Sequence, residues 1–215
     1  MVISRLIGKF GTFSEANRGQ AFTLEAVISS LIVLTALLFA LQSTVVTPNT
    51  TGGIDTATRE TLADQAQDIL DGTATRPTEN LSYYVRYWND SSAERTFARA
   101  SRPEVGYGDE KPPAEFGDQL NDTFTAEGYA YNVILTYQRP NSQDIGEMVM
   151  VYQGTPNRDA VSAVYPVTLF DSDTLTGPAS TDKPIENVSS QIYPIKDVAT
   201  RSPIYNVVEV RITVW

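Results

Sequence analysis

Residues 18–25 read RGQAFTLE and lead directly into residues 26–46, AVISSLIVLTALLFALQSTVV. The second segment contains no charged residue. At a rise of about 1.5 Å per residue, a helix of this length is roughly 31 Å long, which matches the hydrocarbon core of a bilayer. The sequence therefore predicts an N-terminal transmembrane helix, followed by a long region that faces outward.

The order of the parts around the apolar segment differs from that of an ordinary secretory signal. The chain begins with a basic leader, residues 1–19, which ends in the small residue Gly19. A secretory signal places its small-residue cleavage site after the apolar region, so that region is lost on processing. Here the candidate cleavage site, between Gly19 and Gln20, comes before the apolar region. We therefore expect the helix to be retained.

This arrangement resembles the class III signal of type IV pilins and their archaeal pilin-like relatives. In that family a prepilin peptidase cuts after the Gly, which would make Gln20 the new N-terminus. The family motif reads Phe-Thr-Leu-Ile-Glu directly after the Gly, whereas residues 22–25 read FTLE and lack the residue before the Glu. Glu25 therefore falls at the sixth mature position rather than the fifth. The resemblance implies that the helix packs in a filament core with other pilin-like subunits and that Glu25 acts in assembly.

A second interpretation requires no processing. Arg5, Lys9 and Arg18 on the N-terminal side of one membrane helix satisfy the positive-inside rule, which leaves residues 48–215 outside the cell. The chain would then be a single-pass, membrane-anchored extracellular binding domain that does not polymerise. Both interpretations predict a cell-membrane protein with an extracellular C-terminal domain. The pilin-like one adds incorporation into a surface filament as a minor component that serves adhesion or surface assembly.

The acidic composition limits the partners of the outer region. The chain carries 16 Lys and Arg against 26 Asp and Glu, a formal net charge of −10. A surface this acidic disfavours nucleic acid as a partner. It also favours a halophilic archaeal source, because salt screens the repulsion between carboxylates. No cysteine is present, so an apolar core must stabilise the domain without disulfides.

Helical spacing recurs three times after the Pro- and Gly-containing break at residues 47–53. Residues 55–70 predict a stalk helix that ends at Asp71-Gly72. Residues 81–88 predict a short helix. Residues 113–124 predict another, because its first turn contains Pro and Glu, and one apolar stripe follows. The stripe consists of Phe116, Leu120 and Phe124.

Alternating patterns then predict strands at residues 129–138, 147–152, 160–170 and 208–214. Helices followed by strands indicate an α+β fold with an antiparallel sheet. The expected fold is an N-terminal transmembrane and stalk α-helix, then a small helical region and an antiparallel β-sheet. The expected domains are the leader 1–19, a transmembrane or filament helix 20–47, a stalk helix and linker 48–77, and an extracellular α+β domain 78–215.

The sequence contains no recognisable catalytic motif. The lack of His and Cys excludes Ser-His-Asp triads, cysteine nucleophiles and metal centres built from His or Cys. Residues 171–173, DSD, begin like a calcium loop but lack the later Gly and Glu, so we expect a turn. We therefore expect a protein that is not an enzyme and that takes no cofactor and no metal.

Asn-x-Ser and Asn-x-Thr sequons are candidate N-glycosylation sites and fit a surface glycoprotein. They lie at Asn49, Asn80, Asn89, Asn121 and Asn187.

The densest aromatic cluster consists of Tyr83, Tyr84, Tyr87 and Trp88. Such a cluster could form an exposed surface for adhesion or glycan binding. Helical spacing instead favours Tyr84 and Trp88 in the core, with Tyr83 and Tyr87 partly exposed at a contact between subunits.

Overall fold

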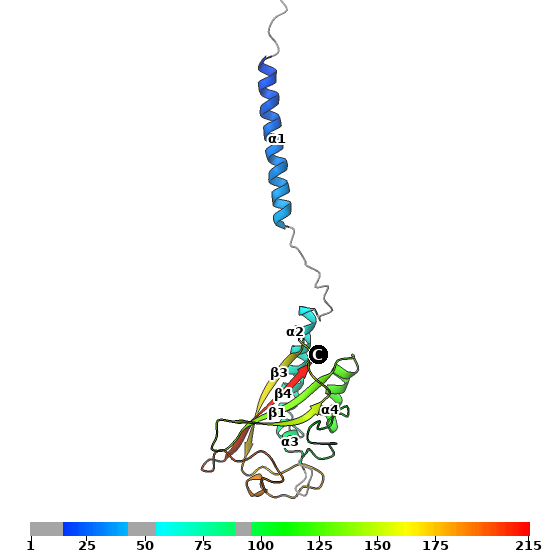
Figure 1. Ribbon diagram of the computed structural model, residues 1–215, viewed down its shortest axis with the longest axis vertical. Helices are drawn as coiled ribbons and strands as arrows, with labels where there is room; N and C mark the ends of the chain where they lie inside the picture. Colours follow the sequence, from blue (N-terminus) through cyan, green and yellow to red (C-terminus); the bar gives the residue numbers. More distant parts are fainter. Residues whose placement is uncertain (1–14, 43–54, 89–95) are drawn as a thin grey trace, which may run out of the picture. The chain divides into compact units, whose positions relative to one another are not determined.

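The computed structural model describes residues 15–42, 55–88 and 96–215, and within the first range it describes side chains at 23 and 25–37. The chain divides into two compact units, Met1–Thr50 and Thr51–Trp215. Figure 1 shows a single helix in the first unit and a mixture of helices and strands in the second.

The first unit contains helix α1, Glu15–Gln42. The prediction of a transmembrane helix is wrong, because no helix formed by the described residues is both long and apolar enough to cross a membrane. The first part of α1 is polar, and its apolar part, residues 26–42, is only about 25 Å long against a hydrocarbon core of roughly 30 Å. The remainder of the predicted span, residues 43–46, lies outside the described residues.

The second unit begins with a small helical region, as predicted. Its elements are α2 (Thr56–Ala74), α3 (Leu81–Val85), α4 (Ala114–Leu120) and a π-helical turn (Asn121–Thr125) that continues α4. The stalk helix passes the predicted stop at Asp71-Gly72, and the Thr75 amide still donates to the Asp71 carbonyl at 3.2 Å. A 3-10 turn, Ile185–Asn187, lies further along the chain.

All four predicted strands form. They are β1 (Tyr131–Gln138), β2 (Ile145–Tyr152), β3 (Val161–Phe170) and β4 (Ile204–Val214). They pair antiparallel in the order β2-β1-β4-β3, with Val133 opposite Ile212 and Val167 opposite Val208. The predicted antiparallel sheet is therefore confirmed.

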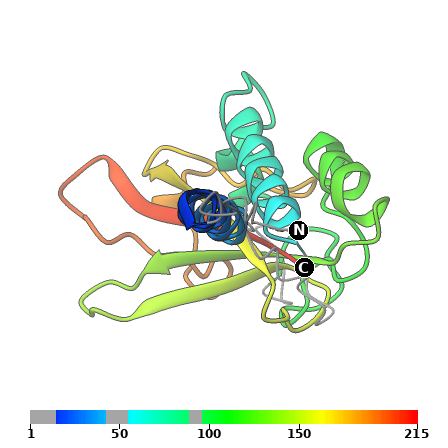
Figure 2. The same cartoon turned by 90° about the horizontal axis from the view of Figure 1, so that it is seen from above.

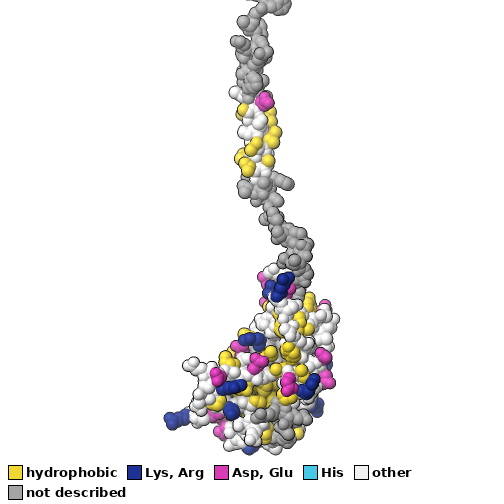
Figure 3. Space-filling model, viewed as in Figure 1, with side chains coloured by type: hydrophobic (Ala, Val, Ile, Leu, Met, Phe, Trp, Pro, Cys, Tyr) yellow, Lys and Arg dark blue, Asp and Glu magenta, His cyan; other side chains and the backbone are white. Residues whose placement is uncertain are grey.

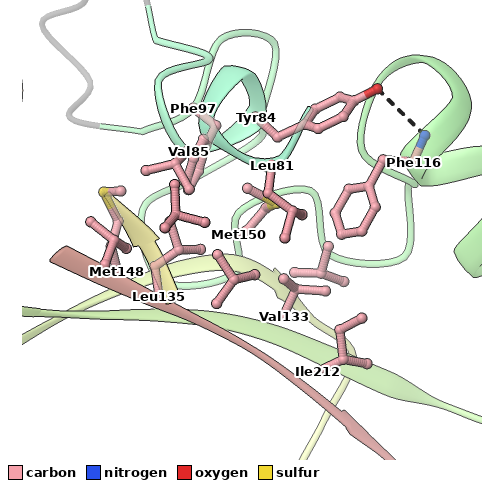
Figure 4. Packing of buried hydrophobic residues seen from close by; sticks show 14 of the residues in the cluster. Leu81, Tyr84, Val85, Phe97, Phe116, Val133, Leu135, Met148, Met150 and Ile212 are labelled. Atoms are coloured by element: carbon pink, nitrogen blue, oxygen red, sulfur yellow. Dashed lines mark hydrogen bonds between the residues drawn. The ribbon is translucent and has the colours of Figure 1, made fainter. Parts of the chain in front are cut away.

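Within the second unit, the helices pack on one face of the sheet, and the described residues of this unit leave the other face exposed. α2 contacts β3 and β4, and Figure 2 shows α2 and α4 on the same side of the strands. Figure 4 shows Leu81, Tyr84 and Phe116 from the helices opposite Val133 and Leu135 of β1. On the open face, Val164 and Val207 are among the exposed large apolar residues.

A loop covers part of the outer edge of β2. The Tyr107 amide donates to the Met150 carbonyl at 2.8 Å, and the Tyr152 amide donates to the Val105 carbonyl at 3.1 Å. Gly106 lies between these contacts with φ at +57°. These bonds satisfy backbone groups that an uncovered edge strand would expose.

Candidate functional site

The apolar part of α1 exposes large side chains on every side of the helix. Seven of them are between 48 and 62% exposed, and successive positions differ by about 100° around the axis. They are Val27, Ile28, Leu31, Ile32, Val33, Leu34 and Leu37. Figure 3 shows this apolar surface along the described part of the helix. A helix on the surface of a soluble protein normally has one apolar stripe, whereas the apolar side chains of α1 surround the helix axis.

Two hydroxyl groups within this surface bond to the helix itself. The Ser30 hydroxyl donates to the Val27 carbonyl at 2.8 Å. The Thr35 hydroxyl lies 2.9 Å from the carbonyl oxygens of both Leu31 and Ile32. A hydroxyl that is satisfied within its own helix can be buried at a lower desolvation cost. These polar residues therefore do not prevent burial of the helix.

Glu25 is the only charged residue among the described side chains of α1, and it is exposed. It lies directly before the apolar part of the helix, as the sequence indicated. The proposed cleavage site, Gly19 and Gln20, lies within the span of α1, but both side chains lie outside the described residues.

The described sequons differ in accessibility. Asn187 is exposed at the end of the 3-10 turn. Asn80 is half-buried and caps α3, where its side-chain oxygen accepts a hydrogen bond from the Tyr83 amide at 3.0 Å. Asn121 is half-buried at the junction of α4 and the π-helical turn. Asn49 and Asn89 lie outside the described residues. Among the described sequons, Asn187 is the most accessible to a glycosyltransferase.

The aromatic cluster belongs mainly to the core. Tyr84 and Trp88 are at most 1% exposed, as predicted. The expectation of partial exposure fails for Tyr87, which is 6% exposed, and holds for Tyr83, which is half-buried. Burial also raises the pKa of the Tyr84 phenol. The cluster therefore offers little surface for adhesion.

Residues 171–173 form the expected turn. The carboxylate of Asp173 accepts a hydrogen bond from the Phe170 amide at 2.9 Å and lies 3.9 Å from the Arg86 guanidinium. Burial raises the pKa of Asp171, and the neighbouring carboxylates of Asp197 and Glu186 raise it further. Within the described ranges, no group of three or more His, Cys, Asp or Glu side chains is placed to hold a metal ion.

Two charged clefts in the second unit were not predicted from the sequence. The basic cleft, of about 410 Å³, lies at the turn between β1 and β2 and includes Arg139, Asp144 and Lys196 in its lining. Across the described chain, neither Arg139 nor Lys196 forms a salt bridge. Arg139 and Lys196 are far apart in the sequence, and only the fold brings them together.

The acidic cleft, of about 360 Å³, lies between α2 and the segment that leads into β1. Asp122 and Glu127 contribute carboxylates, Leu62 and Tyr129 contribute apolar surface, and no Lys or Arg lines it. Both acids are exposed. The only signal in the sequence is a pair of acids shortly before a predicted strand, which is common in so acidic a chain.

Comparison with known proteins gives a family but no function. Neither a curated protein nor a solved structure matches the chain. A family of unknown function, DUF7288, matches residues 18–214. The match begins at Arg18 and includes α1 from that residue onward, together with all the helices and strands of the second unit. The chain therefore belongs to the family of unknown function DUF7288.

Proposed function

We propose that this chain is a pilin-like structural subunit of the cell surface and a minor component of a type IV pilus-like filament. The observation that carries the proposal is the exposed apolar surface of α1, which surrounds the helix on all sides. Such a helix is stable when other apolar surfaces enclose it. In a filament, the same helices of neighbouring subunits supply that enclosure.

The free energy available from this burial is large. Each of the seven exposed side chains still has about half of its surface to bury, which is worth about 1 kcal/mol. Burial of all seven contributes on the order of 7 kcal/mol for each subunit before the cost of association. This amount is comparable with the stability of a whole domain.

The composition of the helix favours close packing against its own copies. Ala26, Ser29, Ser30 and Ala36 are small residues placed among the larger apolar ones. Small side chains let neighbouring helix axes approach more closely, and the Ser30 hydroxyl is already bonded within the helix.

The resemblance to pilins supplies the route into the filament. A prepilin peptidase would cut between Gly19 and Gln20 and remove the basic leader. The mature helix would keep its apolar part and Glu25, together with a new α-amino group at Gln20. Other pilin-like subunits are the expected partners, and their helices would surround α1.

The test compares two variants of the full chain in filaments sheared from the cell surface. Leu34→Glu places a charge on α1, whereas Val164→Glu makes the same kind of change on the open sheet face, beside Arg211 of β4. We expect the wild type and Val164→Glu in the sheared filaments, and Leu34→Glu reduced at least tenfold. Absence of the wild type from those filaments, or equal recovery of both variants, would contradict the proposal.

A further inference from the structure

We propose that the turn between β1 and β2 of one copy docks into the acidic cleft of a second copy, which joins the α+β units head to tail. The docking turn consists of residues 139–145, with Lys196 beside it. This inference rests on the proposed function, because it specifies how neighbouring subunits meet outside the helical core of a filament.

The two surfaces lie at opposite ends of one strand. Tyr129 lines the acidic cleft shortly before β1, and Arg139 directly follows β1 in the basic cleft. Ten residues of extended chain separate these positions by roughly 30 Å. Figure 2 likewise shows the β1–β2 hairpin projecting from one side of the sheet and α4 at the opposite side. A contact between unlike ends of the same chain propagates as an open, head-to-tail series.

The shapes of the two partners are complementary. The docking turn projects from the sheet, and its Ile145 side chain is 70% exposed. The acidic cleft is concave, and the half-buried Tyr129 lines it, whereas Leu62 in its lining is only 3% exposed. Ile145 lies at the base of the turn, opposite Gln138, so the projecting turn can enter the cleft while Ile145 remains exposed beside it.

The charges are complementary as well. Arg139 and Lys196 are exposed cations that form no salt bridge elsewhere in the described chain. Asp122 and Glu127 provide two carboxylates in a cleft that no cation lines. The basic cleft also contains the carboxylate of Asp144, so its lining carries two cations against one anion, and the acidic end of another copy is a partner of the opposite charge.

Salt affects the two parts of this interaction differently. Copies of so acidic a chain repel one another over long distances, and this repulsion is screened when the Debye length falls to about 3 Å near 1 M salt. Charges in direct contact at a partly buried interface are screened less. Concentrated salt therefore weakens the long-range repulsion between copies but preserves the charged contact between the docking turn and the acidic cleft.

The absence of natural cysteine permits a direct test by disulfide cross-linking. Gln143→Cys places a thiol on the exposed docking turn, and Thr123→Cys places one at the acidic cleft. Filaments that carry both substitutions in one full-length chain should give a ladder of cross-linked oligomers on mild oxidation. A mixture of the two single variants should give dimers only, and each single variant alone should give none.

Charge exchange identifies the surfaces that meet. In the double-cysteine chain, Arg139→Glu with Lys196→Glu should reduce the ladder at least tenfold. Asp122→Lys with Glu127→Lys should do the same, and all four changes together should restore it. Lys183→Glu with Arg201→Glu alters the charge equally outside both clefts and should leave the ladder unchanged. Melting temperatures of all variants identify any that fail to fold.

Several outcomes would overturn the inference. The inference is wrong if the double-cysteine chain folds and enters filaments but gives no cross-linked ladder. It is also wrong if either single-cysteine variant alone forms dimers, because such dimers indicate contact between identical surfaces. The docking turn should also not cross-link to a different protein, and the four charge substitutions together should restore the ladder. Either contrary result would show that the acidic cleft does not bind the docking turn of a second copy. If the chain is instead absent from sheared filaments, the proposed function fails. The fraction of the chain found in the filament pellet therefore distinguishes failure of the proposed function from failure of the docking inference.

Discussion

Buried tyrosines give the α+β unit a specific sensitivity to alkali. Tyr131 is 1% exposed, and burial raises its pKa to about 12 from the ordinary value of 10.0. Burial, with help from Asp197 and Asp171, also raises the pKa of Tyr205 to about 12. Between pH 10 and 12 the unfolded chain therefore releases phenol protons that the folded chain retains. The free energy of unfolding should be unaffected by these groups below pH 10 and should fall as the pH rises through this window.

Tyr131→Phe tests this linkage. The substitution should reduce the alkaline loss of unfolding free energy by about 2 kcal/mol, because it removes one phenol whose pKa differs between the two states by roughly two units. At pH 7 it should change the stability by less than about 1 kcal/mol. Denaturant unfolding at pH 7, 10 and 12 measures both effects. An equal loss of stability in the wild type and the variant between pH 10 and 12 would argue against this assignment.

We expect assembly to depend on Glu25, because it is the one charge among the described side chains of α1 and lies directly before the apolar part of the helix. A carboxylate buried among apolar helices is costly unless a cation pairs with it. The α-amino group of a processed neighbour, at Gln20, would provide that cation. Glu25→Gln should leave processing unchanged and should reduce incorporation into sheared filaments at least tenfold. Quantitative blotting of the sheared material measures this, and equal recovery would exclude the assembly role.

At the level of helices and loops, two glycines predict opposite effects of the same substitution. A Cβ at Gly106 would lie 2.0 Å from the Met150 carbonyl oxygen, and its φ of +57° disfavours Ala as well. Gly106→Ala should therefore lower the free energy of unfolding by about 2–4 kcal/mol. Gly72 lies exposed in α2, and a Cβ added there would meet no atom within 4 Å, so Gly72→Ala should raise it by up to about 1 kcal/mol. Thermal unfolding measures both, and similar effects of the two changes would contradict these assignments.

The helices and strands that were predicted correctly each have one buried face, which is marked in the sequence by regularly spaced apolar residues. Val208, Val210, Ile212 and Val214 of β4 are all buried, and the stripe of α4 and its continuation is buried completely. A single sequence suffices for such elements, because side chains on one face of a strand or helix recur at a fixed interval.

The end of α3 could not be predicted in the same way. Trp88 is buried at helical spacing from Leu81, yet the helix stops at Val85. Beyond that point, the Arg86 and Trp88 carbonyls accept hydrogen bonds from the amides of Thr176 and Gly177. A segment distant in the sequence therefore replaces the helical bonds. The charged clefts escaped prediction for the same reason, since each joins segments that are far apart in the sequence.

For the chain taken together, charge predicts a dependence of stability on salt. The formal net charge of −10 produces repulsion within the folded chain that strengthens when the Debye length grows from about 3 Å near 1 M salt to about 30 Å near 0.01 M. The melting temperature should fall by about 5 °C or more over this range. Scanning calorimetry of the full chain at both salt concentrations measures the shift, and coincident melting curves would contradict a halophilic character.

The proposed pilin-like subunit retains its apolar helix after its leader is removed and buries that helix among other subunits. The sharpest measurement is the N-terminal sequence of the chain recovered from sheared surface filaments. We predict a mature protein that begins at Gln20, directly after Arg18-Gly19. A chain that begins at Met1, or one that is cut beyond the apolar part of α1, would contradict the proposal.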